Sequence, residues 1–259
     1  MDQSREACEL LYRHWGAGTQ LESLPSGLRP ATRAEGYAVQ AHLESQTRAP
    51  LYGWKIAATS VNGQRHIGVD GPLAGRILAE RVVADGGDFV LGTSLMRVAE
   101  LEFAFRMAVD LAPRATPYTQ DEVLSAVATL HPAIELPDSR FAHFETAGPA
   151  QLVADNACAH YFVLGPACDD GWRALNLAAH PGNAFRNGAL AEEGVGANVL
   201  GDPRIALTWL ANELSAHGMT LKAGQVVTTG TCVKPVVIAV GETIEGDLGP
   251  LGRVSVRIV

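Results

Sequence analysis

The chain has 259 residues, 47% of them hydrophobic and 19% charged, a composition typical of a globular protein. Its formal net charge of −8 and the lack of any lysine or arginine run argue against a nucleic-acid or anionic-membrane partner. No apolar run is long enough to span a membrane, no signal-peptide core opens the chain, and its four cysteines form no CxxC pair, so we expect a cytoplasmic protein with reduced thiols.

The N-terminal fifty residues favour helices, over residues 4–16 and 32–49. Thr32 and Glu35 have the spacing of a capping box, in which two side chains bond to free N–H groups at a helix start. The pattern changes at about residue 51. We therefore expect a helical region over residues 1–50 and one main domain over residues 51–259.

The main domain is rich in predicted strands and poor in predicted helices. A loop is expected over 68–75, a short helix after the capping box Thr119–Glu122, and a longer helix over 203–217. The expected strands cover residues 51–58, 88–91, 97–111, 126–136, 159–164, 225–229, 233–240, 242–247 and 252–258. Because this order lacks regular βαβ alternation, the fold class is α+β.

Three carboxylates interrupt apolar strands. Glu100 and Glu102 are one residue apart, so in a strand they share one face, and Glu135 stands in a second apolar run. Three such groups supply hard oxygen ligands and leave about three positions of an octahedral ion open, which suits Mg²⁺ or Mn²⁺ better than zinc. The alternative is that the glutamates are exposed or paired with nearby arginines.

Further polar residues stand in apolar surroundings. Lys55 lies inside an apolar strand, where it either meets an anion or reaches water from a sheet edge. Asp155 follows a helical-looking stretch and suits a helix C-terminus. Thr231 belongs to Thr229-Gly230-Thr231 at the end of a strand, which offers hydroxyl and N–H groups to a carboxylate or forms an ordinary turn.

An ordered set of segments is similar to a known family. The segments are Gly53-Trp54-Lys55-Ile56, Ile67-Gly68-Val69-Asp70-Gly71-Pro72, Glu100-Leu101-Glu102-Phe103-Ala104-Phe105, Pro132-Ala133-Ile134-Glu135-Leu136-Pro137-Asp138-Ser139-Arg140, Ala154-Asp155-Asn156-Ala157, Val199-Leu200-Gly201-Asp202-Pro203, Trp209-Leu210-Ala211-Asn212 and Leu221-Lys222-Ala223-Gly224-Gln225. Together they resemble the 2-keto-4-pentenoate hydratase group of the fumarylacetoacetate hydrolase superfamily, which also holds the 4-oxalocrotonate decarboxylases.

The resemblance implies a mixed β-sheet roll with flanking helices and a small N-terminal helical region. It implies Mg²⁺ or Mn²⁺ on Glu100, Glu102 and Glu135, and a homo-oligomer that acts in the catabolism of aromatic compounds. The sequence departs from the hydratase pattern at Leu73, where hydratases often carry an aspartate, and at Cys158, where a serine is common.

The expected reaction is the addition of water to a 2-hydroxy-2,4-dienoate, which gives a 4-hydroxy-2-oxoacid. Lys55 would neutralise the substrate carboxylate or move a proton, with Asp70 and Asp155 as further proton-transfer candidates. Leu73 and Thr231 are expected to contact the substrate. The alternatives are decarboxylation of a 2-oxo-3-enedioate, hydrolytic C–C cleavage of an acylpyruvate, and a non-catalytic protein that binds 2-oxoacids.

Overall fold

The computed structural model describes residues 2–259, and within this range the chain forms six α-helices and thirteen β-strands. The helices are α1 (Gln3–Ala17), α2 (Arg33–Ala41), α3 (Val61–His66), α4 (Gln120–Ser125), α5 (Pro149–Ala154) and α6 (Pro203–Ala216). The strands are β1 (Gly53–Ala57), β2 (Leu73–Ile77), β3 (Val82–Val83), β4 (Asp88–Phe89), β5 (Val98–Met107), β6 (Val127–Leu136), β7 (Tyr161–Leu164), β8 (Pro181–Arg186), β9 (Ala189–Val195), β10 (Val226–Thr231), β11 (Val236–Val237), β12 (Thr243–Asp247) and β13 (Arg253–Ile258).

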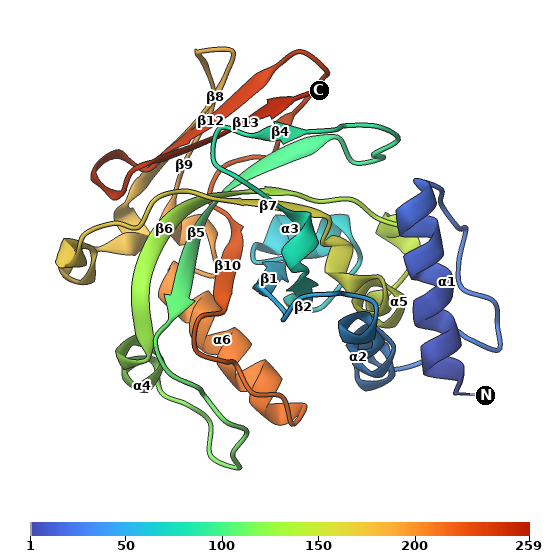
Figure 1. Cartoon of the computed structure of the whole chain (residues 1–259). Helices are drawn as coiled ribbons and strands as arrows, with labels where there is room; N and C mark the ends of the chain where they lie inside the picture. The colour runs from blue at the N-terminus through green and yellow to red at the C-terminus, as the bar shows by residue number, and fades with distance from the viewer. Residues whose placement is uncertain (1) are drawn as a thin grey trace.

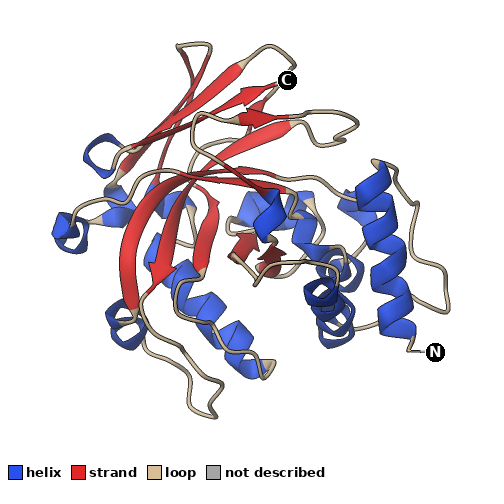
Figure 2. Cartoon of the chain, in the orientation of Figure 1, coloured by secondary structure: helices blue, strands red, loops and turns tan. Residues whose placement is uncertain are grey.

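The strands form two curved mixed sheets, which confirms the expected α+β roll. The larger sheet has the order β2-β1-β10-β5-β6-β7-β3, with β11 also paired to β5. The smaller sheet has the order β4-β13-β12-β8-β9 and stands at one end of the molecule (Figure 1). Helices α1, α2 and α5 gather on one side of the larger sheet, and α6 lies on the other side of β1 and β2 (Figures 1 and 2).

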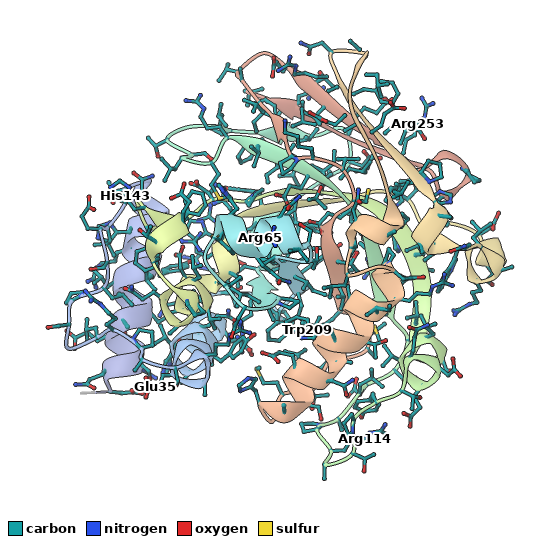
Figure 3. The ribbon with its side chains drawn as sticks, turned by 180° about the vertical axis from the view of Figure 1, so that it is seen from behind. Glu35, Arg65, Arg114, His143, Trp209 and Arg253 are labelled. Carbon is teal, nitrogen blue, oxygen red and sulfur yellow. The ribbon has the colours of Figure 1, made fainter. Side chains whose placement is uncertain are left out.

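Several elements differ from the sequence prediction. Strand β3 was not expected, and the helix expected over 32–49 ends as an α-helix at Ala41. The segment expected as a loop over 68–75 contains the start of β2, whose pattern Leu-Ala-Gly-Arg-Ile is buried throughout and so shows no alternation. Helix α3 is short, polar and begins at Ser60, whose hydroxyl accepts a hydrogen bond from the N–H of Gly63 at 3.0 Å. In the view from behind, Arg65 on α3 lies above Trp209 on α6 (Figure 3). Strands β8 and β9 were missed because they carry glycine, asparagine and glutamate, which have low β propensity.

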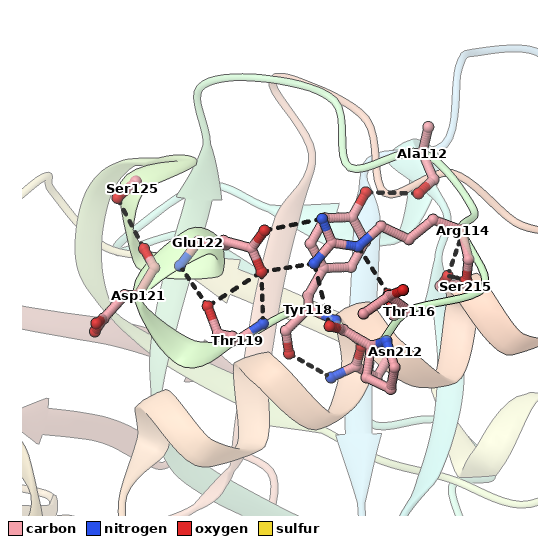
Figure 4. A network of polar contacts seen from close by, with 11 residues as sticks. Ala112, Arg114, Thr116, Tyr118, Thr119, Asp121, Glu122, Ser125, Asn212 and Ser215 are labelled. Atoms are coloured by element: carbon pink, nitrogen blue, oxygen red, sulfur yellow. Dashed lines mark hydrogen bonds and ion pairs between the residues drawn. The ribbon is translucent and has the colours of Figure 1, made fainter.

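The predicted helix starts are confirmed. Thr32 with Glu35 and Thr119 with Glu122 both form reciprocal capping boxes, and Asp202 caps α6 through the N–H of Arg204 at 2.8 Å. Glu122 is held further by a two-point ion pair with Arg114, drawn with its neighbours in Figure 4. In the same network Asn212 of α6 bonds to both backbone groups of Tyr118, which ties the segment before α4 to α6.

The N-terminal helices share one apolar cluster with the sheet. Ala7, Leu11 and Trp15 of α1 are buried in the same cluster as Trp54 of β1 and Phe105 of β5. The division of the chain at residue 50 therefore stays a prediction. No helix in the part of the chain that the structure describes is long and apolar enough to cross a membrane.

Gly53 marks a close approach between β1 and β10. The two strands pair in parallel, and a Cβ atom at Gly53 would lie 1.9 Å from the carbonyl oxygen of Val226. Any side chain at position 53 must therefore push the strands apart. Lys55 follows two residues later on β1, so this contact also sets the position of its side chain.

We expect Gly53→Ala to lower the free energy of unfolding by about 2 kcal/mol or more, because the added methyl group overlaps backbone atoms that cannot move singly. The measurement is the shift of the thermal unfolding midpoint. Gly27→Ala is the matched control, because Gly27 is exposed and a Cβ there meets no atom within 4 Å. An equal effect of the two substitutions would contradict the argument.

Candidate metal centre

Three carboxylates converge on one face of the larger sheet. Glu100 and Glu102 project from β5, and the register places Glu100 directly opposite Glu135 on β6. Each residue offers an oxygen atom, and these three atoms lie within 4.8 Å of one another. The predicted convergence of the three glutamates is therefore confirmed, and it follows from alternation along β5 together with the antiparallel register.

The cluster is buried and carries unsatisfied acceptors. Glu102 is 0% exposed and Glu135 is 2% exposed. Glu102 Oε1 and both side-chain oxygens of Glu135 accept no hydrogen bond from any residue between positions 2 and 259. Burial, followed by the charge of Glu135, raises the pKa of Glu100 to about 7, and the same two causes raise the pKa of Glu102 well above its usual range. Three unscreened carboxylates in such a place need a cation or protons.

Lys55 lies inside this cluster, so of the two alternatives considered from the sequence it meets an anion. Its Nζ is 2.9 Å from Glu135 Oε1 and donates a hydrogen bond to the carbonyl oxygen of Ala157 at 3.0 Å. Burial lowers the pKa of Lys55, but the charges of Glu135 and Glu100 outweigh it, and the pKa is raised. Lys55 is therefore a charged ammonium that keeps N–H capacity beyond its hydrogen bond to Ala157.

A β-bulge in β10 holds Glu102 in place. The pairing of β10 with β5 shifts between Thr228 and Thr231, and Gly230 adopts a φ of 94° there. As a result, the N–H of Gly230 donates to Glu102 Oε2 at 2.8 Å, and the Thr228 hydroxyl donates to the same oxygen. Sequence reasoning found the hydroxyl-rich strand end but missed Thr228, whose role depends on a register that the sequence does not show.

A turn with strained backbone geometry provides the second contact of Lys55, besides Glu135. Asn156, Ala157 and Cys158 all have positive φ values, of 57°, 50° and 60°. The Asn156 amide fixes the turn to β2, because it accepts from the N–H of Arg76 at 2.6 Å and donates to the carbonyl of Arg76 at 2.8 Å. Gly75 leaves room for the turn, since a Cβ there would lie 2.3 Å from the Asn156 carbonyl oxygen. The contacts that impose this strained geometry also fix the Ala157 carbonyl, which accepts the hydrogen bond from Lys55.

The two aspartates named from the sequence lie outside the carboxylate cluster. Asp155 is buried, pairs with Arg140, and accepts a hydrogen bond from the Ser139 hydroxyl at 2.7 Å. It is the C-cap of α5 and precedes the strained turn, which is the structural alternative considered from the sequence. Asp70 is 87% exposed and paired with Arg33 at the surface. Neither contact leaves a free carboxylate aimed at the glutamates.

Leu73 and Thr231 border the site. Leu73 is fully buried on β2 opposite Ala57, and it shares the face of Lys55 because Gly75 stands opposite Lys55 in the same antiparallel pair. Thr231 stands opposite Glu102, and its hydroxyl donates to the carbonyl of Val233 at 2.8 Å. Contact of either residue with a substrate stays a prediction.

A cavity of about 530 Å³ opens beside Glu100. It is lined by His66, Leu95, Met96, Val98, Glu100, Ala142, Phe144, Glu145, Lys234 and Pro235. Its volume is that of a small-molecule site. A larger cavity of about 620 Å³, beside Tyr52 and Trp54, is lined by none of the three glutamates, so the chemistry belongs to the smaller one.

The donor set fits a hard divalent cation. Three carboxylate oxygens within reach of one another, two of them on buried groups with unsatisfied acceptors, match the ligands that Mg²⁺ and Mn²⁺ take. The set includes neither histidine nor cysteine, which zinc prefers.

The chain is similar in sequence to proteins of known activity. Residues 48–259 match the family model described as fumarylacetoacetate (FAA) hydrolase C-terminal. The chain is 31% identical over 250 residues to the 2-oxo-hept-4-ene-1,7-dioate hydratase of Escherichia coli, a match that covers 93% of this chain and 92% of that protein. It is 30% identical over 256 residues to the 2-keto-4-pentenoate hydratase of Paraburkholderia xenovorans, covering 97% and 93%.

The fold is also similar to that of a solved enzyme. The structure of 4-oxalocrotonate decarboxylase from Pseudomonas putida G7, complexed with magnesium and adipate, superimposes with a TM-score of 0.89 at 26% identity and covers 100% of this chain and 98% of the other. The same decarboxylase complexed with calcium and acetate gives a TM-score of 0.88 at 25% identity.

We expect Glu102→Gln to separate the role of the cluster in Mg²⁺ binding from its cost to the stability of the metal-free protein. Mg²⁺ should raise the unfolding temperature of the native protein by several degrees through mass action, and should have no such effect on the variant, which lacks one of three ligands. With EDTA present, the variant should unfold at the same or a higher temperature than the native protein, because an amide at position 102 needs neither a cation nor a proton to be buried there. Scanning calorimetry at neutral pH measures both shifts.

The control is Glu193→Gln, which neutralises an exposed carboxylate on β9 and should keep the full Mg²⁺ shift. If Glu102→Gln keeps that shift too, the three glutamates are not the metal ligands.

Proposed function

Because the chain belongs to the fumarylacetoacetate hydrolase family, we propose that it is a metal-dependent hydratase that adds water to a 2-hydroxy-2,4-dienoate and gives a 4-hydroxy-2-oxoacid. The observation that carries the proposal is the convergence of Glu100, Glu102 and Glu135 beside Lys55. Relatives over most of the chain include the two hydratases described above, which supports this chemistry. The proposed setting is the breakdown of aromatic compounds in the cytoplasm, by a homo-oligomer.

The three carboxylates would hold Mg²⁺ or Mn²⁺. When bound, such an ion polarises an oxygen of a 2-oxoacid or its enol and stabilises negative charge there. The buried protein groups keep water away from that charge, except through the cavity beside Glu100. Gly230 and Thr228 both donate to Glu102 Oε2, so the protein itself orients this carboxylate.

Lys55 is the residue that we place in catalysis. Its ammonium group donates a hydrogen bond to the Ala157 carbonyl and forms an ion pair with Glu135, and it keeps N–H capacity that can donate to a substrate carboxylate. Its positive charge can stabilise the anionic head of the substrate. Alternatively, the amino group of Lys55 can move a proton to and from the dienol. Asp155 is engaged by Arg140 and Asp70 by Arg33, which leaves Lys55 as the strongest of the predicted proton-transfer groups.

Decarboxylation of a 2-oxo-3-enedioate is the second candidate. The decarboxylase from Pseudomonas putida G7 shares the whole fold, and the same metal chemistry draws electrons from a departing carboxylate. Leu73 favours this alternative, because it places an aliphatic side chain on the Lys55 face where hydratases often carry an aspartate.

The proposal predicts Mg²⁺-dependent hydration. Incubation with 2-hydroxy-2,4-pentadienoate should consume the diene and form 4-hydroxy-2-oxopentanoate without release of CO₂. EDTA should abolish the reaction, and Mg²⁺ or Mn²⁺ should restore it. Parallel incubation with 2-oxo-3-hexenedioate tests the second candidate, and CO₂ release from that substrate without hydration of the first would favour decarboxylation. Full turnover in a metal-free preparation would refute both.

Replacement of Lys55 should impair catalysis without loss of the metal site. We expect Lys55→Met to lower kcat about a hundredfold or more, since an ammonium that moves protons or stabilises charge is removed. Mg²⁺ binding, measured by calorimetry, should not weaken, because a positive charge beside Glu135 is lost. Lys55→Arg should restore part of kcat if charge alone matters. Unchanged kcat in Lys55→Met would exclude the assigned role.

A further inference from the structure

We propose that the substrate carries a second carboxylate at the end of its tail and that Lys234 binds it. This inference rests on the proposed function, which defines the 2-oxoacid head but leaves the tail open. Lys234 lines the cavity that opens beside Glu100. Among the lining residues that the structure describes, it is the one lysine or arginine.

The backbone holds Lys234 at the level of Glu100. On one side of it, the N–H of Cys232 donates to the carbonyl of Leu101 at 2.9 Å. On the other side, Val236 pairs with Ala99 in the β11–β5 ladder. The connection between β10 and β11 is therefore fixed to β5 at both ends, immediately above and below Glu100. Pro235 restricts the backbone next to Lys234 further.

The charge of Lys234 is available to a ligand. The chain contains three lysines, at positions 55, 222 and 234. Lys55 is committed to Glu135, whereas Lys234 forms no ion pair with any residue from 2 to 259. Its side chain is exposed, so its ammonium group can move toward an anion in the cavity at little desolvation cost.

Most of the remaining wall is apolar. Leu95, Met96, Val98, Ala142, Phe144 and Pro235 supply apolar surface. Glu145 is the one carboxylate of the wall besides the metal ligand Glu100 and would repel a tail anion that lay near it. The rings of His66 and Phe144 pack in a T-shaped arrangement, with 6.0 Å between their centroids. A dicarboxylate would thus place its chain on the apolar wall and its far carboxylate at Lys234.

Matched ligands test this assignment without turnover. 2-Oxopimelate and 2-oxoheptanoate share a 2-oxoacid head and chain length and differ by the terminal carboxylate. In the presence of Mg²⁺, calorimetry should show about tenfold or tighter binding of 2-oxopimelate to the native protein. Lys234→Met, which keeps the apolar stem, should remove this preference, and Lys234→Arg should keep it. Lys222→Met makes the same change of net charge at the other cavity and should leave the preference intact.

Equal binding of the two ligands by the native protein, or a preference that survives in Lys234→Met, would overturn the inference. A preference that also disappears in Lys222→Met would overturn it, since net charge would then be the cause. Turnover separates this inference from the proposed function. Hydration with equal kcat/KM for mono- and dicarboxylic dienoates refutes the role of Lys234 alone. A Lys234-dependent binding preference without hydration of either refutes the proposed reaction alone.

Discussion

The mutual repulsion of three carboxylates, two of them buried and one partly buried, is the constraint on which the rest of this structure depends. Glu100, Glu102 and Glu135 are placed together by strand register, which is set by apolar packing on the opposite face of the sheet. Their charges are met from neighbouring strands of the same sheet, by Lys55 on β1 and by donors from β10. Repulsion among the carboxylates therefore lowers the free energy of unfolding, and a bound divalent cation offsets this effect. Metal binding is in this way coupled to stability.

Two irregular backbone segments near this cluster each direct a hydrogen-bonding group at one charged side chain. The bulge at Gly230 turns an N–H toward Glu102, and the left-handed turn at Asn156–Cys158 turns a carbonyl toward Lys55. Both are departures from regular geometry, and both lie at the ends of elements that pack tightly. Local strain is thus concentrated where a donor or acceptor must point at a charged group.

The sequence predicted what depends on periodicity and missed what depends on pairing. Alternation in β5 placed Glu100 and Glu102 on one face, and the caps at Thr32, Thr119 and Asp202 marked three helix starts. Thr228 and Asn156 act through a bulge and a cross-chain contact with β2, which no local pattern encodes. Asp70 matched a family segment, yet its side chain turns to Arg33 at the surface.

The metal centre and the cavity wall are built from different kinds of structural element. The three carboxylates stand on paired strands in the middle of the larger sheet, whereas the wall opposite them comes from α3 and from the segments around Leu95, Phe144 and Lys234, which lie mainly in connections. Connections accept substitutions and changes of length more readily than central strands do. A lineage built on this scaffold can therefore diversify the compounds it consumes while its reactive centre stays constant.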